Sequence, residues 1–134
     1  MRHEVVETIA GVPIVLMDSI STIGPAEAGA VVVSASHGGR ISGAFAAKHP
    51  PKLVIFNDAG IGKNEAGIAC LADLDRTGAP ALCVAHTSCR IGDAADAWAR
   101  GRVSRVNAAA ARGGIAEGAS LRDAVAAFIR HGGA

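Results

Sequence analysis

Three short polar segments each follow a run of apolar residues, and each contains side chains that could do chemistry. They span 36–40, 57–63 and 86–90. All three end in a basic residue, and the first and last also contain a histidine. A neutral imidazole can donate or accept a proton near neutral pH. The segments therefore predict a site that moves a proton on a bound molecule.

The candidates for proton transfer are two histidines and one aspartate. We expect His37 or His86 to act as general acid or base, and Asp58 to orient one of them. The alternative for either histidine is a hydrogen-bonded structural role. Together the three side chains would also make a two-histidine, one-carboxylate metal set. They come from separate segments without a diagnostic spacing, so we assign no metal and no other cofactor.

Cys89 is the candidate nucleophile. It precedes a predicted helix and is flanked by Ser88 and Arg90, a setting expected to lower the pKa of a thiol. Its alternative role is that of a small residue filling a turn. Cys70 and Cys83 lie on apolar faces of a predicted helix and strand, so we expect them to pack in the core. An odd number of cysteines without framework spacing favours reduced thiols.

Glycines in the first two segments could let the backbone approach a ligand. These are Gly38, Gly39, Gly60 and Gly62. Free N–H groups at the start of a helix bind anions, although tight turns need glycine for their backbone angles alone. The P-loop motif fails, because Asn64 follows Lys63 where Ser or Thr is needed, and the dinucleotide fingerprint fails, because Glu65 takes its third glycine position. We therefore do not expect ATP or NAD.

Basic residues are predicted at or just before three helix N-termini. They are Arg40, Lys63 and Arg90. The helix dipole disfavours positive charge there, so something negative is expected to share the site. A bound anion would satisfy this expectation, and so would ion pairs with nearby acidic residues such as Asp58, Glu65 or Asp93.

Other polar side chains complete the predicted ligand-binding set: Ser36, Asn57, Thr87, Ser88 and Asn107. Two of them have an equally good structural explanation. Asn57 could form an Asx-turn, and Asn107 could cap a helix.

Apolar runs that alternate with helical patterns must position these segments. Expected strands span 3–9, 12–17, 30–35, 53–56 and 82–85, and 103–107 is either a strand or the start of a helix. Expected helices span 41–49, 64–77 and 93–100, with a short one at 108–112 and a last one after Ser120. Runs without polar interruption are typical of parallel strands buried on both faces.

We therefore predict a single α/β domain over residues 1–134. It would have a mainly parallel, doubly wound sheet of the Rossmann or flavodoxin-like three-layer kind, with helices on both faces and an N-terminal β-hairpin. Ligands bind beyond the carboxyl ends of such strands. All three polar segments follow strands, so we expect them to meet at one edge of the sheet.

Composition argues against several partners. A net charge of +1 and the absence of Tyr give no basis for nucleic-acid binding or for an anionic membrane. No apolar run reaches the roughly 18 residues of a membrane span. The N-terminus lacks the apolar core of a signal peptide, so we expect a cytoplasmic protein. Half of the residues are hydrophobic and 19% are charged, which favours a homo-oligomer with Ala-rich helical interfaces.

These features predict a small cytoplasmic enzyme that works by proton transfer, of hydrolase, lyase or isomerase type. Its substrate would be a small polar or anionic metabolite. The alternative is a non-catalytic small-molecule-binding or assembly module, which would use the same glycines and basic residues without moving a proton.

Overall fold

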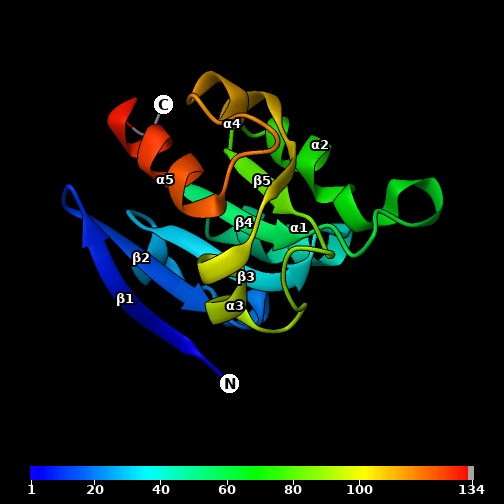
Figure 1. The fold of residues 1–134 in the computed structure, drawn as a ribbon, viewed down its shortest axis with the longest axis horizontal. Coiled ribbons are helices and arrows are strands. Elements are labelled where there is room, and N and C mark those ends of the chain that lie inside the picture. The colour runs from blue at the N-terminus through cyan, green and yellow to red at the C-terminus, as the bar shows by residue number, and fades with distance from the viewer. Residues whose placement is uncertain (133–134) are drawn as a thin grey trace.

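A six-stranded β-sheet forms the centre of the molecule in the computed structural model, which describes residues 1–132 (Figure 1). The strands are β1 (His3–Ile9), β2 (Val12–Met17), β3 (Val31–His37), β4 (Leu53–Asn57), β5 (Ala81–Val84) and β6 (Val103–Val106). The helices are α1 (Arg40–Lys48), α2 (Cys70–Asp75), α3 (Ala94–Arg100), α4 (Ala108–Arg112) and α5 (Leu121–Arg130). Three 3-10 segments are η1 (Ile20–Thr22), η2 (Pro25–Glu27) and η3 (Lys63–Ile68).

The strands lie in the sheet in the same order as in the sequence. Strands β2 to β5 are parallel, and β1 and β6 pair antiparallel at the two ends. The first two strands form the predicted hairpin. Its two-residue turn has φ of 49° at Ala10 and 83° at Gly11, and two positive angles match the twist of a tight hairpin.

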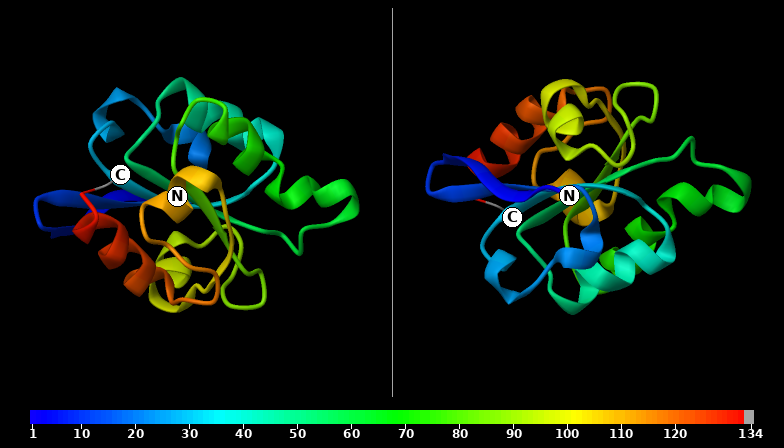
Figure 2. Two further views of the ribbon diagram at one scale, coloured as in Figure 1. Left: turned by 90° about the horizontal axis from the view of Figure 1, so that it is seen from above. Right: turned by 90° about the horizontal axis from the view of Figure 1, so that it is seen from below.

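The predicted mixed α/β fold with a mainly parallel sheet is confirmed, whereas its doubly wound topology is not. A doubly wound sheet reverses its strand order at one point, and this sheet does not. Helix α1 connects β3 to β4, and α2 connects β4 to β5. Both connections are expected to be right-handed and both lead to the next strand on the same side, so α1 and α2 lie on the same face of the sheet. Helices on the opposite face come from the C-terminal part of the chain (Figure 2).

Alternate strand residues face the two helical layers. On one face, Val32, Val54 and Phe56 pack with residues of α1 and α2. On the other face, the neighbouring residues of the same strands pack with Trp98 of α3 and Phe128 of α5. Burial on both faces explains the uninterrupted apolar runs of β3 and β4.

Side chains cap the N-termini of α3 and α5. The side chain of Asp93 accepts a hydrogen bond from the backbone N–H of Asp96. In the same way, Ser120 accepts one from the N–H of Asp123. Each cap satisfies an N–H group that the first turn of a helix leaves free.

The helix predicted over 64–77 is wrong in its first half. Asn64 and Glu65 have left-handed backbone angles, with φ of 57° and 58°, and α2 begins only at Cys70. The chain instead folds back beneath the end of β4, where the N–H of Gly67 donates to the carbonyl of Ile61 at 2.7 Å. A Cβ at Gly67 would lie 2.0 Å from the carbonyl oxygen of Asp58, so this close approach requires glycine.

No helix within residues 1–132 combines the length and the apolar character needed to cross a membrane.

Candidate functional site

The three polar segments meet at the carboxyl edge of the sheet, as the sequence predicts. In the strand register His37 pairs with Asn57, and Asn57 pairs with Val84, two residues before His86. Parallel strands end at the same edge. Side chains from all three segments are therefore neighbours across adjacent strands.

A buried carboxylate contacts an exposed imidazole at this edge. The side chain of Asp58 is 6% exposed and that of His86 is 54% exposed. Oδ1 of Asp58 accepts hydrogen bonds from the backbone N–H of Gly60 at 2.8 Å and of His86 at 3.0 Å. It also lies 3.3 Å from Nδ1 of the His86 ring. Because a carboxylate only accepts hydrogen bonds, this contact places a proton on Nδ1 and leaves Nε2 of the neutral ring as an acceptor.

Asp58 remains ionised despite its burial. Desolvation alone would raise its pKa, but hydrogen bonds from the Gly60 N–H, the Ser104 side chain and His86 outweigh it, and the pKa falls below its ordinary value of 3.8. The Ser104 hydroxyl also lies 3.2 Å from the carbonyl oxygen of Cys83, so its one proton has two possible acceptors. A carboxylate so placed can orient the His86 ring.

His37 has the opposite tautomer. Its ring is at the exposed end of β3, and its Nδ1 accepts a hydrogen bond from the backbone N–H of Gly39 at 3.1 Å. In the neutral ring the proton is then on Nε2. His37 therefore offers a donor where His86 offers an acceptor. Asn57 ends β4, the strand between them, and Asp58 follows it directly.

A groove of about 720 Å³ opens beside His37. It lies between the start of α1 and residues 59–69. The residues that line it are His37, Gly39, Arg40, Ile41, Ala59, Ile61, Gly62, Asn64, Ala66, Gly67 and Ala69. Asp58 and His86 are not among them. A smaller cavity of about 420 Å³, along α2 and the start of α4, contains neither histidine.

The segment 59–62 borders both the groove and His86. A Cβ at Gly60 would lie 3.5 Å from the His86 ring, whereas Ala59, Ile61 and Gly62 line the groove. Ala59 and Ile61 have φ of 51° and 67°. A left-handed angle at a β-branched residue is a true outlier and costs about 1–3 kcal/mol. The hydrogen bond from Ile61 N–H to the Asp58 carbonyl at 2.6 Å helps to hold this shape.

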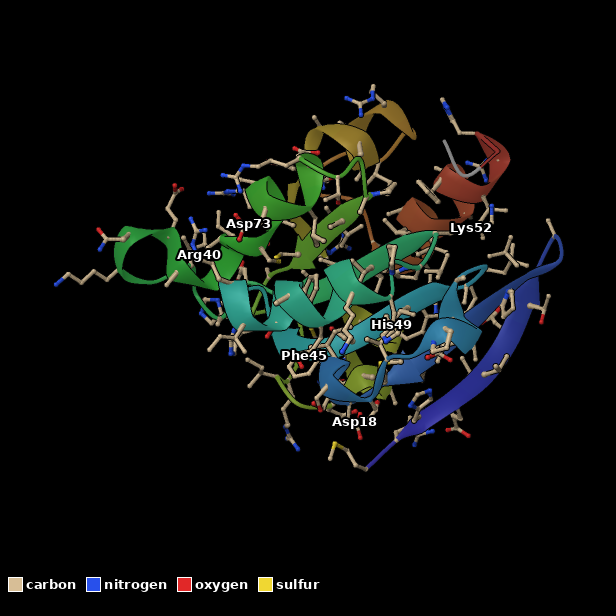
Figure 3. All side chains as sticks on the ribbon, turned by 180° about the vertical axis from the view of Figure 1, so that it is seen from behind. Asp18, Arg40, Phe45, His49, Lys52 and Asp73 are labelled. Carbon is tan, nitrogen blue, oxygen red and sulfur yellow. The ribbon has the colours of Figure 1, made fainter. Side chains whose placement is uncertain are left out.

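Only one of the three basic residues begins an α-helix. Arg40 is the first residue of α1, whereas Lys63 opens a 3-10 segment and Arg90 lies before the turn that leads into α3. Arg40 already has a negative partner, because its Nη1 lies 3.0 and 3.3 Å from the two carboxylate oxygens of Asp73 (Figure 3). Asp73 also pairs with Arg76. A local ion pair thus accounts for Arg40, with a partner other than the three acidic residues expected.

Lys63 and Arg90 have exposed side chains that make no ion pair within residues 1–132. The backbone N–H of Arg90 donates to Asp96 at 2.7 Å. Neither side chain lines the groove. Their role in binding an anion stays a prediction.

The predicted lowering of the Cys89 pKa is wrong. The residue is 6% exposed and belongs to the core cluster under α3. Burial raises the pKa of its thiol, and the hydrogen bond from Ser88 only partly offsets that rise. The helix that would supply a favourable dipole begins only at Ala94. Cys89 therefore lacks the lowered pKa on which its predicted nucleophilic role depended.

Asn107 does not lie at the predicted site. Strand β6 runs antiparallel to β5, so Asn107, which follows β6, is at the opposite edge of the sheet, beside Ala81. Its side chain caps α4, which is the structural alternative for this residue. Ser104, at the other end of β6, is the residue from this part of the chain that reaches Asp58.

The remaining predicted residues lie at the carboxyl edge, and several have structural partners. Asn57 forms the alternative Asx-turn, because its Oδ1 accepts from the N–H of Ala59 at 2.8 Å. Ser36 accepts from the N–H of Ile20, and Ser88 donates to the carbonyl of Ala85. Thr87 is exposed beside Ser88.

Two of the glycines have a packing explanation. A Cβ at Gly38 would lie 2.6 Å from the Gly67 carbonyl oxygen, and a Cβ at Gly39 would lie 2.7 Å from the His37 ring. The apolar groove was not predicted, because the candidate residues were all polar, small or charged. The sequence signal for it is Ile41, an isoleucine in the first turn of α1 that the structure leaves exposed.

His37, Asp58 and His86 do not form the metal set considered above, because no three potential ligands gather around one point within residues 1–132. No protein-family model, curated protein or solved structure matches the chain. A fold shared by many activities does not identify one of them, so function must be inferred from the residues at the carboxyl edge.

Proposed function

We propose that the chain is an enzyme that moves a proton on a small polar or anionic metabolite at the carboxyl ends of β3, β4 and β5. Its reaction is of hydrolase, lyase or isomerase type and needs no cofactor. The observation that carries this proposal is the contact between the buried Asp58 carboxylate and the exposed His86 ring. Burying a charged carboxylate is costly unless hydrogen bonds compensate for the lost water. At Asp58 one of the compensating groups is the ring of His86, which is exposed to solvent.

His86 is the general base in this proposal. Its Nε2 takes a proton from the substrate or from an attacking water, and Asp58 stabilises the imidazolium that forms. His37 donates a hydrogen bond in this proposal, since its Nε2–H can point to an oxygen that gains negative charge while keeping its proton. When the proton on His86 returns to the product, His86 regains its starting tautomer.

The competing proposal is a non-catalytic small-molecule-binding or assembly module. The groove favours the binding module, because neither Asp58 nor His86 is among the residues that line it. A binding module would keep its ligand unchanged.

A thermal-shift screen with small polar and anionic metabolites, followed by assay of each hit for turnover, tests the enzyme proposal. We expect His86→Ala and Asp58→Asn to keep the thermal shift of the hit and to lose about 100-fold or more of its turnover. His131→Ala, which removes an exposed histidine at the end of α5, is the matched control. Wild-type protein that binds hits without turning any over would favour the binding module. Full turnover in His86→Ala would exclude His86 as the base.

A further inference from the structure

The walls of the groove beside His37 are mostly apolar and open to solvent. Ile41 is 77% exposed although it is a large aliphatic residue. Across from it are Ile61 and three alanines, Ala59, Ala66 and Ala69. Ile61 is held there in a left-handed conformation that an isoleucine rarely adopts. A volume of about 720 Å³ is within the range of small-molecule sites.

The one charged side chain that lines the groove already has a partner of opposite charge. Arg40 is that side chain, and its Nη1 lies 3.0 and 3.3 Å from the two carboxylate oxygens of Asp73. An anion beside Arg40 would also approach that carboxylate, and a cation would meet the arginine. This pairing favours an uncharged molecule in the groove.

Its polar groups favour a hydrogen-bond acceptor. Gly39 occupies Nδ1 of His37, so Nε2–H of the neutral ring is the free donor. The amide of Asn64 is the other uncharged polar side chain in the lining. An oxygen that accepts from His37, attached to a short apolar chain, would match both the donor and the walls.

We propose that this groove binds an uncharged small molecule with a short apolar chain and an accepting oxygen, such as an amide, ketone or ester. The site is separate from the Asp58–His86 contact. It stands whether or not His86 catalyses a reaction, because it depends on His37, Ile41 and Ile61.

Three probes with six carbon atoms each test the proposal: hexanamide, hexanoate and hexylammonium. Each is titrated into isotope-labelled protein while backbone amide NMR signals are followed. We expect hexanamide to shift the signals of residues 59–69 and of the start of α1, and to bind at least about tenfold more tightly than either charged probe. Hexanoate that binds as tightly as hexanamide, or shifts confined to other parts of the molecule, would overturn the proposal.

Two variants locate the binding. Ile61→Asn removes an apolar wall but suits the left-handed backbone, so we expect it to fold and to bind hexanamide at least about tenfold more weakly. Ile91→Asn is the control, since Ile91 is a 49% exposed isoleucine outside the groove. Equal binding by Ile61→Asn and wild type would contradict the proposal.

Two further results separate this site from its alternatives. We expect His37→Ala to weaken hexanamide binding and His86→Ala to leave it unchanged, so failure of the proposed base does not affect this test. If the groove signals instead shift with protein concentration alone, and light scattering gives the mass of a dimer, then a second copy of the chain covers the groove and the proposal is wrong.

Discussion

An asparagine is buried at each end of the parallel strands, Asn107 at the amino edge and Asn57 at the carboxyl edge. Their side chains differ in how many hydrogen bonds they make. At the amino edge, Oδ1 of Asn107 accepts from the N–H groups of Ala81 and Ala110, and its Nδ2 donates to the carbonyls of Ala79 and Leu71. At the carboxyl edge, the Asn57 side chain has one short bond, from Ala59, and a contact of 3.9 Å to the sulfur of Cys89.

The acidic residues follow the same division. Asp75 accepts from the N–H groups of Ala108 and Ala109 at the start of α4, so its bonds stay inside the fold. The bonds of Asp58 lead to an exposed histidine. A buried polar side chain whose hydrogen bonds all go to other groups of the protein stabilises the fold. A buried carboxylate that also contacts a solvent-exposed imidazole, as Asp58 does, can act on a bound substrate through that ring.

The largest effect should come from removing Asn107. Asn107→Ala would leave buried N–H and C=O groups without partners, each at a cost of about 1–3 kcal/mol. We expect it to lower the free energy of unfolding by about 3–5 kcal/mol and Asn57→Ala to lower it by about 1 kcal/mol, measured by urea denaturation. Equal losses would remove the distinction between the two edges.

The rate of thiol alkylation should differ between Cys89, at the carboxyl edge of the sheet, and the two core cysteines, Cys70 and Cys83. Burial raises the pKa of Cys70 to about 12 and that of Cys83 well above its ordinary 9.0, so both are almost wholly thiols near neutral pH. Cys89 is less deeply buried. We expect iodoacetamide to label it first in the folded protein, yet far more slowly than in urea, as followed by mass spectrometry. Rapid labelling of folded Cys89 would instead restore it as a nucleophile.

The acid dependence of stability tests Asp58. Because folding lowers its pKa below 3.8, the ionised carboxylate stabilises the fold above that value, and this contribution is lost as the pH falls through the folded pKa. We expect Asp58→Asn to be less stable than wild type at neutral pH, and the difference to shrink in urea titrations run below pH 3.8. A difference that stays constant with pH would show that Asp58 is not bonded as described.

The smallest effect should follow from Arg40→Ala. The Arg40 side chain is 70% exposed, and exposed ion pairs contribute about 0–1 kcal/mol. We expect a loss within that range that salt reduces further. Arg76→Ala is the matched control, because it removes the other partner of Asp73. If Arg40→Ala abolished binding of an anionic hit and Arg76→Ala did not, Arg40 would hold the ligand after all.

The elements were predictable where local pattern and core burial agree. The hairpin, the buried runs of β3 and β4 and the capped helix α3 follow from apolar continuity, turn residues and cap residues. The helix expected over 64–77 failed because Gly67 packs against the Asp58 carbonyl, a tertiary contact that helix propensity does not encode.

The candidate site was predictable only in part. The positions of His37, Asp58 and His86 could be predicted because each residue follows or ends an apolar strand, and parallel strands end at the same edge of the sheet. The position of Asn107 depends on the direction of β6, which a four-residue strand does not reveal. The groove depends on a left-handed Ile61, and no rule for isoleucine predicts that conformation.

The sequential order of the strands also has a consequence for synthesis. As the chain emerges from the ribosome, α1 and α2 can cover their face of the sheet as soon as β3, β4 and β5 pair. The opposite face, with Val33 and Ile55, waits for α3 and α5, because no earlier helix reaches it.

A nascent chain that ends before residue 94 would therefore carry a sheet with one bare apolar face. Such a surface is prone to aggregate or to recruit chaperones. Trp98 and Phe128 bury it only late, and Arg122 then pairs with Glu7, 115 positions earlier in the chain. The last third of the sequence must therefore be synthesised before this face of the sheet is covered.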